Sequence, residues 1–181
     1  MTKDDEVRQF NEDRRGELER RAAVAAVVKR LKAHTPRVSP TWDMSSRAPD
    51  HNDVDENLLA HGLALYTAPL DDIWAGLYDP SVYEADTLWA DIHDDNKIGG
   101  VILAWEQGRP LSPPMFVRYD HLPEAYVADG KHRLTVARYM EAQTVPFLVP
   151  ATQKDMEWAG GVVRAGSPQW QSQAPAKSRS P

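Results

Sequence analysis

The stretch "YVADGKHRLTVARYMEAQTVPFLV" (residues 126–149) decides most of the fold that this sequence predicts. It begins as an apolar, β-favouring run, passes an Asp-Gly turn at Gly130, continues as a helix and ends in a second apolar run from Val145. Short apolar runs bounded by turn residues favour strands, and glycine marks the turn. We therefore expect strand, turn, helix and strand in this order.

Helices and strands are expected to follow one another through the rest of the organised region. The sequence predicts a short helix leading into a strand over 58–66, a helix over 97–107, strands over 115–119 and 125–129, a helix over 131–142 and a strand over 145–149. Gly108 and then Pro110 end the 97–107 helix. This order predicts an α+β fold, a small mixed sheet with flanking helices.

Four segments are expected along the chain. Residues 1–34 form a charged N-terminal helix, residues 35–57 a loop or linker rich in Pro, Ser, Asp and Asn, residues 58–160 the α+β domain, and residues 161–181 a disordered tail that cannot bury enough apolar surface to order. The N-terminal helix is expected to project from the domain and pack only its alanine- and valine-rich half. This helix either only packs against the domain or binds a protein partner, which can be another copy of the chain.

Composition restricts the class of protein. The 181 residues carry a formal net charge of −6 and no cysteine, which excludes disulfides, thiolate metal sites and cysteine nucleophiles. No run approaches the roughly 20 apolar residues of a membrane span, and no secretory leader is recognisable. We expect a cytoplasmic protein with no membrane contact.

Charge is unevenly distributed. Residues 43–95 hold thirteen acids and one base, whereas residues 96–181 hold ten bases and seven acids. A locally basic region around 126–149 is suited to meet an anion, while the negative total argues against a protein coated in nucleic acid. The alternative is that the acids are simply spread over solvated faces.

The first turn of the predicted 131–142 helix is unusually basic. A helix N-terminus leaves backbone N–H groups unpaired and carries about half a positive charge, so Lys131, His132 and Arg133 are unfavourable there unless an anion arrives. Gly130 allows close approach of the backbone, and Asp129 holds the turn. We expect a phosphate-binding site, with a solvated helix start as the alternative.

Helical spacing extends this expectation. Lys131, Thr135 and Arg138 share one face at i, i+4 and i+7 and are expected to face the phosphate, while Leu134 and Ala137 face the core.

The segments "EQGRPLSPPMFV" and "YVADGKHRLTVARYMEAQTVPFLV" together resemble the ParB/sulfiredoxin superfamily. In that family a glycine-ended helix, a proline-containing link and two strands lead to a Gly-x-His-Arg turn, a helix and a strand that begins with Val-Pro. The resemblance covers about residues 66–150. The matching positions are Gly108, Pro113, Pro114, Gly130, His132, Arg133 and Pro146.

The resemblance implies a nucleotide phosphate, from ATP, CTP or ADP, held at residues 129–133. It implies DNA-clamp gating, phosphate transfer, nuclease or NTPase activity, with Mg²⁺ arriving together with the nucleotide. Sulfiredoxins carry their reactive cysteine where Lys131 stands, so sulfinate reduction is excluded. Only about thirty residues follow Pro150, too few for the DNA-binding and dimerisation regions of partition proteins. The small stand-alone ParB-like proteins of plasmids and phages, including fertility-inhibition factors, are the comparison.

These arguments define the expected site residues. His132, Arg133 and Glu106 are the expected catalytic residues, with Glu106 as general base because family enzymes use an acid from the opposing wall. The phosphate-binding set is Asp129, Gly130, Lys131, His132, Arg133, Gly108, Arg118, Thr135 and Arg138. Glu106 is alternatively a surface glutamate, and Arg118 is alternatively plainly exposed. The acidic stretches 51–55 and 91–95 match no metal motif, so no dedicated metal site is expected.

The sequence thus predicts a nucleotide-binding hydrolase, an NTPase or a nuclease acting on DNA in a plasmid or phage. The alternative is a non-enzymatic module that binds a nucleotide or a protein and inhibits a conjugation or defence system.

Overall fold

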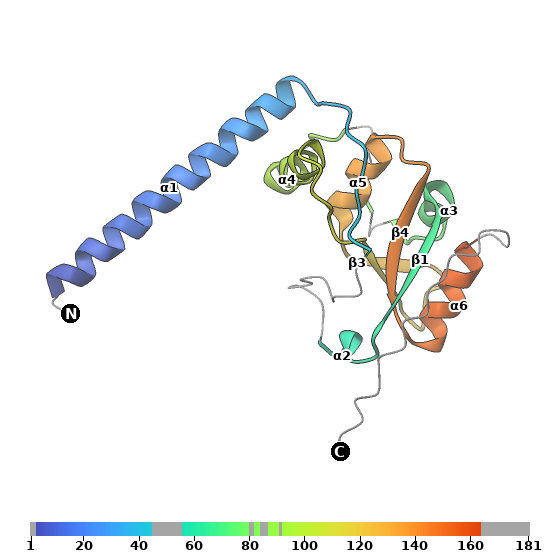
Figure 1. Cartoon of the computed structure of the whole chain (residues 1–181). Helices are drawn as coiled ribbons and strands as arrows, with labels where there is room; N and C mark the ends of the chain where they lie inside the picture. Colours follow the sequence, from blue (N-terminus) through green and yellow to red (C-terminus); the bar gives the residue numbers. More distant parts are fainter. Residues whose placement is uncertain (1–2, 45–55, 80–81, 84–86, 91, 164–181) are drawn as a thin grey trace, which may run out of the picture.

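The computed structural model describes residues 3–44, 56–79, 82–83, 87–90 and 92–163. The expectations for the linker residues 45–55 and for the tail beyond residue 163 lie outside this part. The chain has the predicted α+β fold, a small mixed sheet with flanking helices (Figure 1). Its elements are α1 (Lys3–Ala33), α2 (Glu56–Leu59), β1 (Leu63–Pro69), α3 (Leu70–Ala75), α4 (Asp95–Glu106), β2 (Met115–Arg118), β3 (Ala125–Asp129), α5 (Lys131–Tyr139), β4 (Thr144–Pro150) and α6 (Gln153–Val162).

The sheet has the strand order β1-β4-β2-β3. The outer pairs β1–β4 and β2–β3 are antiparallel, and the central pair β2–β4 is parallel. β4 lies inside the sheet and is buried on both faces, with Val145, Phe147 and Val149 fully buried on one face and Leu148 buried on the other. This position explains its nearly continuous apolar sequence.

The main core lies on the face of the sheet that α5 and α6 cover. Phe147 is its centre: its ring lies 5.3 Å from that of Phe116, 5.7 Å from Tyr66 and 5.9 Å from Trp158. A smaller apolar cluster occupies the opposite face, where Leu58 and Leu59 of the α2 region pack against buried residues of β2 and β4.

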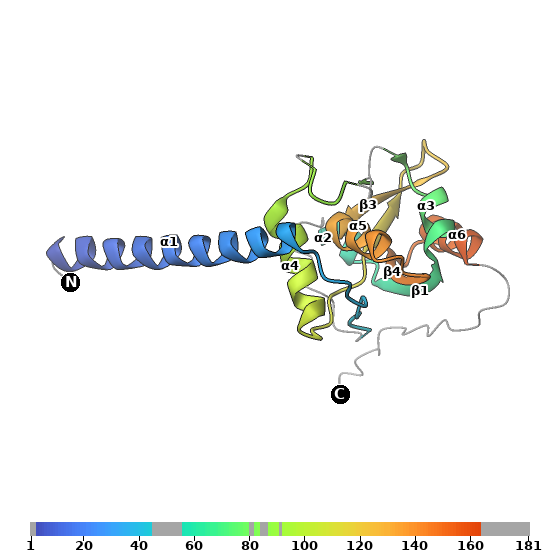
Figure 2. The ribbon, with the colours of Figure 1, turned by 90° about the horizontal axis from the view of Figure 1, so that it is seen from above.

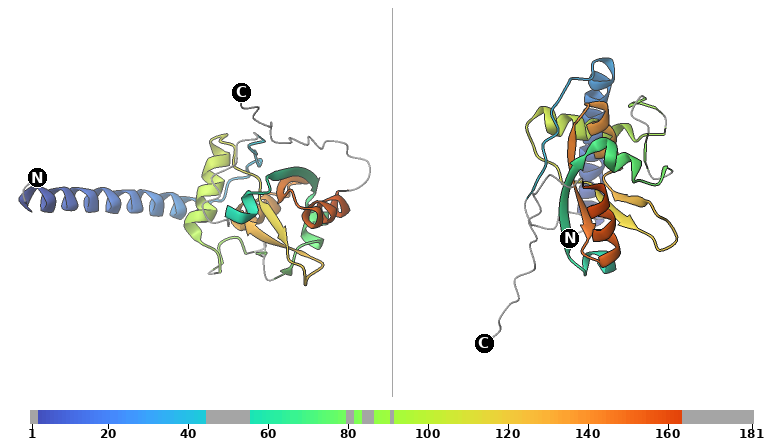
Figure 3. Two further views of the ribbon diagram at one scale, coloured as in Figure 1. Left: turned by 90° about the horizontal axis from the view of Figure 1, so that it is seen from below. Right: turned by 90° about the vertical axis from the view of Figure 1, so that its right-hand side faces the viewer.

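α1 runs away from the domain, as Figures 1, 2 and 3 agree. Only its last turns pack: Leu31 and Val28 are buried, whereas Leu18 is 58% exposed. Ala22 and Ala25 are also exposed, so the prediction that the whole alanine/valine half packs is wrong. The reason is that α4 contacts α1 only near the C-terminal end of α1. There the two helices pack so closely that a Cβ on Gly99 would lie 3.0 Å from Val28.

The prediction misplaces the end of one helix and misses another helix altogether. α5 ends at Tyr139 rather than at residue 142, and Glu141 adopts a left-handed φ of 58° in the turn to β4. α6 was not predicted, and it reaches Val162, inside the segment expected to be tail. Gly160 and Gly161 lower the helix propensity of α6, so its sequence does not favour a helix, although Thr152 caps its start.

No helix in the described part of the chain combines the length and the apolar character required to cross a membrane.

Phe147→Ala should lower the free energy of unfolding by about 3–5 kcal/mol, because it removes the ring at the centre of the main core and leaves a cavity. Guanidinium chloride unfolding of both proteins measures this. A loss below about 1 kcal/mol would show that Phe147 is not a central core residue.

Candidate functional site

The start of α5 depends on the conformation of Gly130. Gly130 is the N-cap residue and has φ 88° and ψ 18°, in the left-handed region, and its carbonyl accepts the first helical hydrogen bond from the Leu134 N–H at 2.9 Å. A Cβ at this position would lie 2.8 Å from Cα of Pro114, closer than real Cβ contacts. Both the dihedral angles and the space therefore require glycine.

Arg133 folds back over this turn. Its Nη2 donates to Asp129 Oδ2 at 2.8 Å, and both side chains are largely buried, at 20% and 25% exposed. Arg133 Nε is buried without a hydrogen-bond partner among the described residues. Arg133 thus joins the last residue of β3 to the first turn of α5, which makes it a residue that positions the turn.

Lys131 and His132 gather around one aromatic ring. Lys131 Nζ lies 5.3 Å from the centre of the Tyr83 ring, and the His132 ring meets the same ring edge-on at 5.2 Å. His93 packs on Tyr83 at 5.0 Å. His93 is 6% exposed, and its Nδ1 lies 2.7 Å from the Leu88 carbonyl oxygen.

The N-termini of α4 and α5 converge at this cluster. The Asp94 backbone N–H donates to His132 Nε2 over a long 3.4 Å, so the neutral imidazole carries its proton on Nδ1. The Asp94 carboxylate is occupied as the cap of α4, accepting from the N–H groups of Asn96 at 2.9 Å and Lys97 at 3.2 Å. α4 therefore has its own cap.

α5, in contrast, has no side-chain cap. The N–H groups of Lys131, His132 and Arg133 have no intrahelical acceptor, because the first turn of any helix lacks one. They lie at the positive end of the helix dipole, where an anion is the favoured ligand.

The pKa of His132 lies below the ordinary value of 6.5. Burial is the main cause, and the positive charge of Lys97 adds to it; Asp94 opposes the shift, while His93 and Lys131 reinforce it. His132 is therefore neutral at pH 7, and the site offers its Nδ1–H as a donor beside lysines from two helices.

Two predicted residues lie far from this cluster. Glu106 is the last residue of α4, roughly 16 Å along the helix from its start. It forms an ion pair with Arg30 of α1 at 2.7 Å, which lowers the pKa of its carboxyl group. Gly108, with φ 67°, follows the same helix end. The structure does not bring Glu106 or Gly108 to the predicted phosphate.

Thr135 and Arg138 do not form a common face with Lys131. Thr135 is fully buried, with its Oγ1 lacking a hydrogen-bond partner among the described residues. Arg138 donates to Asp71 at 3.0 Å and lies over the Trp74 ring at 4.5 Å, at the opposite end of α5. The i, i+4 spacing still leaves about 40° of rotation between Lys131 and Thr135, and Thr135 falls on the buried side of the helix.

Arg118 lies at the far end of the β2–β3 hairpin. Its backbone N–H donates to the buried carboxylate of Asp155 at 2.7 Å, and its guanidinium donates to the Leu122 carbonyl at 3.0 Å. β2 and β3 are antiparallel and pair Arg118 with Ala125, so Arg118 is remote from Asp129. Its contacts are those of a residue that closes the hairpin.

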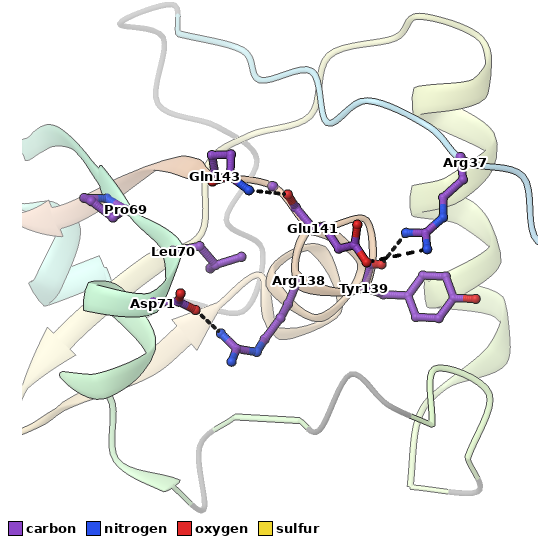
Figure 4. Close-up of a pocket in the computed structure, with 9 residues that line it drawn as sticks. Arg37, Pro69, Leu70, Asp71, Arg138, Tyr139, Glu141 and Gln143 are labelled. Atoms are coloured by element: carbon purple, nitrogen blue, oxygen red, sulfur yellow. Dashed lines mark hydrogen bonds and ion pairs between the residues drawn. The ribbon is translucent and has the colours of Figure 1, made fainter.

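A depression of about 540 Å³ lies at the C-terminal end of α5 (Figure 4). Arg37 reaches into it and donates to the carbonyl oxygen of Tyr139 at 2.9 Å, while Arg138 meets Asp71 across it. The Arg37 bond satisfies a carbonyl group at the negative end of α5, which is the end remote from Gly130. The depression is therefore separate from the cluster at Gly130.

Among the residues that the structure describes, no group of three or more His, Asp and Glu is placed to hold a metal ion.

The sequence argument identified Asp129 to Arg133 but missed the residues that face them. Tyr83, His93 and Asp94 come from a region for which no helix or strand was predicted, and Lys97 is the first residue of the predicted 97–107 helix. Comparison of the chain with protein-family models, with curated proteins and with solved structures finds no match.

Gly130→Ala should destabilise the protein more than Gly62→Ala. Both glycines have positive φ, at 88° and 76°, but a Cβ at Gly62 meets nothing within 4 Å. We expect a loss of about 1–2 kcal/mol for Gly62→Ala from backbone strain, and about 1–3 kcal/mol more for Gly130→Ala from the contact with Pro114. Urea unfolding of both variants compares them, and equal losses would contradict the close approach.

Proposed function

We propose that the N-terminus of α5 binds a phosphate group, and that the ligand is a nucleotide such as ATP or CTP. The observation that carries this proposal is the uncapped first turn of α5, which starts at a left-handed glycine and whose His132 is influenced by the positive charges of Lys97 and Lys131. Backbone N–H groups at a helix start together with lysines are the usual means of holding phosphate oxygens.

The internal contacts of the cluster assign different roles to its residues. Arg133 and Asp129 neutralise each other and hold the turn, so they fix the direction of the N–H groups. Among the described residues, Lys131 contacts Tyr83 through a cation–π interaction and forms no ion pair, so it is the residue that changes partner when an anion binds. His132 donates from Nδ1 without adding charge.

The ParB/sulfiredoxin relationship remains a prediction. It agrees with the strand, Gly130 turn and helix of the present fold, and with the proline link that lies against Gly130. It also suggests DNA as a possible second ligand and a plasmid or phage context.

Hydrolysis of a phosphoanhydride or phosphodiester bond is the second candidate function, and the neutral His132 favours it. An imidazole at the phosphate can transfer a proton, and Mg²⁺ carried by the nucleotide would offset charge on the reacting group. Glu106 is not available as the base, since it pairs with Arg30. Incubation of the protein with ATP, CTP and plasmid DNA in the presence of Mg²⁺ distinguishes a hydrolase from a protein that only binds phosphate. Turnover that is lost in His132→Gln supports a hydrolase, and binding without turnover supports a non-enzymatic binding protein.

Lys131→Gln should weaken the binding of ATP, CTP or inorganic phosphate about 5- to 10-fold, because it removes one charge beside the phosphate, worth about 1–1.4 kcal/mol. Isothermal titration calorimetry measures the affinities. The matched control is Lys154→Gln, since Lys154 pairs with Asp120 at the remote hairpin, and its affinity should not change. Failure of the unaltered protein to bind any phosphate compound at millimolar concentration would overturn the proposal.

Affinity for sulfate should rise as the pH falls from 8 to 5.5. Sulfate does not titrate in this range, so any dependence belongs to the protein. The pKa of His132 is lowered in the free protein and a bound dianion raises it, so binding takes up a proton and becomes tighter at lower pH, by at most about tenfold per pH unit. His132→Gln should remove most of the slope, and the exposed His121→Gln should keep it; a flat profile for the unaltered protein would contradict the role of His132.

A further inference from the structure

The middle of α1 is apolar around its whole circumference. Residues 22–28 read Ala-Ala-Val-Ala-Ala-Val-Val without a polar side chain, and seven successive residues at 100° each pass through more than one full turn. A helix that is apolar all round is normally buried.

In this structure most of that segment is not covered. Val28 is buried against α4, but residues 22–26 are exposed, and Val24 is 44% exposed. Leu18, one turn earlier, is 58% exposed. α1 continues away from the domain (Figures 2 and 3), so this part of it lies beyond the reach of α4.

A projecting helix also needs stabilisation from outside itself. Helices gain most of their stability from tertiary packing, to which an intrahelical ion pair such as Arg15–Glu19 at 3.8 Å adds little. Exposed i, i+4 pairs contribute only about 0.3–0.5 kcal/mol each. A partner that covers residues 18–27 would supply the missing contacts.

Charge along α1 indicates which partner fits. Residues 3–13 hold two bases and five acids, a net of −3, whereas residues 14–33 hold seven bases and two acids, a net of +5. In the antiparallel register that sets Glu12 opposite Lys29, residues 8–13 of each helix, with one base and two acids, lie against residues 28–33 of the other, with three bases. A parallel copy would place like charges side by side, which is unfavourable.

We propose that α1 is a self-association surface and that two copies of the chain pair through antiparallel α1 helices. The alanines at 22, 23, 25 and 26 let the two backbones approach closely, and Leu18 and Val24 supply the larger apolar contacts. Each domain lies at the C-terminal end of its own α1, so the antiparallel pair holds the two domains apart (Figure 1). This surface is independent of the phosphate site.

Sedimentation equilibrium of the full chain over about 1–200 μM tests the proposal. We expect a reversible monomer–dimer equilibrium and at least a tenfold weaker dimer for Val24→Glu. Gln153→Glu adds the same charge at an exposed position of α6 and should leave the equilibrium unchanged. Far-UV circular dichroism at a concentration where both variants are monomeric checks that α1 still forms. A chain that stays monomeric over the whole range, or equal effects of the two variants, would overturn it.

The orientation has its own test, because the chain contains no cysteine. A mixture of Glu12→Cys and Lys29→Cys copies should form the mixed disulfide in preference to either homodimer. Preferential Glu12→Cys homodimers would show a parallel pair and contradict the antiparallel arrangement.

Discussion

The contact between the backbone of Gly130 and Pro114 is the constraint on which the rest of this structure depends. Because Gly130 carries no side chain, β3 can turn directly into α5 while the link before β2 passes close against the turn. The same conformation leaves the first N–H groups of α5 without a side-chain cap. The close packing against Pro114 and the uncapped helix start on which the proposed anion site rests thus depend on one residue.

The electrostatics of the turn follow from this geometry. A basic helix start is unfavourable in isolation, and the protein offsets part of it by pairing Arg133 with Asp129. What remains is the positive charge of Lys97 and Lys131, both close enough to a neutral His132 to lower its pKa. Under the proposed function, such a site exchanges the Lys131 cation–π contact with Tyr83 for a phosphate when the ligand binds.

The sequence was sufficient where local rules act alone. Gly130, Gly108 and the apolar runs of β2, β3 and β4 determined the order of elements, because turn chemistry and strand periodicity are local. The positions of Glu106, Thr135 and Arg138 depend on helix rotation and on partners such as Arg30 and Asp71, which are distant in the sequence. Tyr83 and His93 were missed for the same reason, since only the folded chain brings them to α5.

The most direct measurement is a titration of the ¹⁵N-labelled chain with inorganic phosphate, followed through its backbone amide NMR signals. We expect the largest shifts at the amides of residues 130–133 and smaller ones at Lys97, and we expect all of them to saturate together. Shifts confined to the depression near Arg37 and Arg138, or no saturable shift at the start of α5, would contradict the proposed phosphate site.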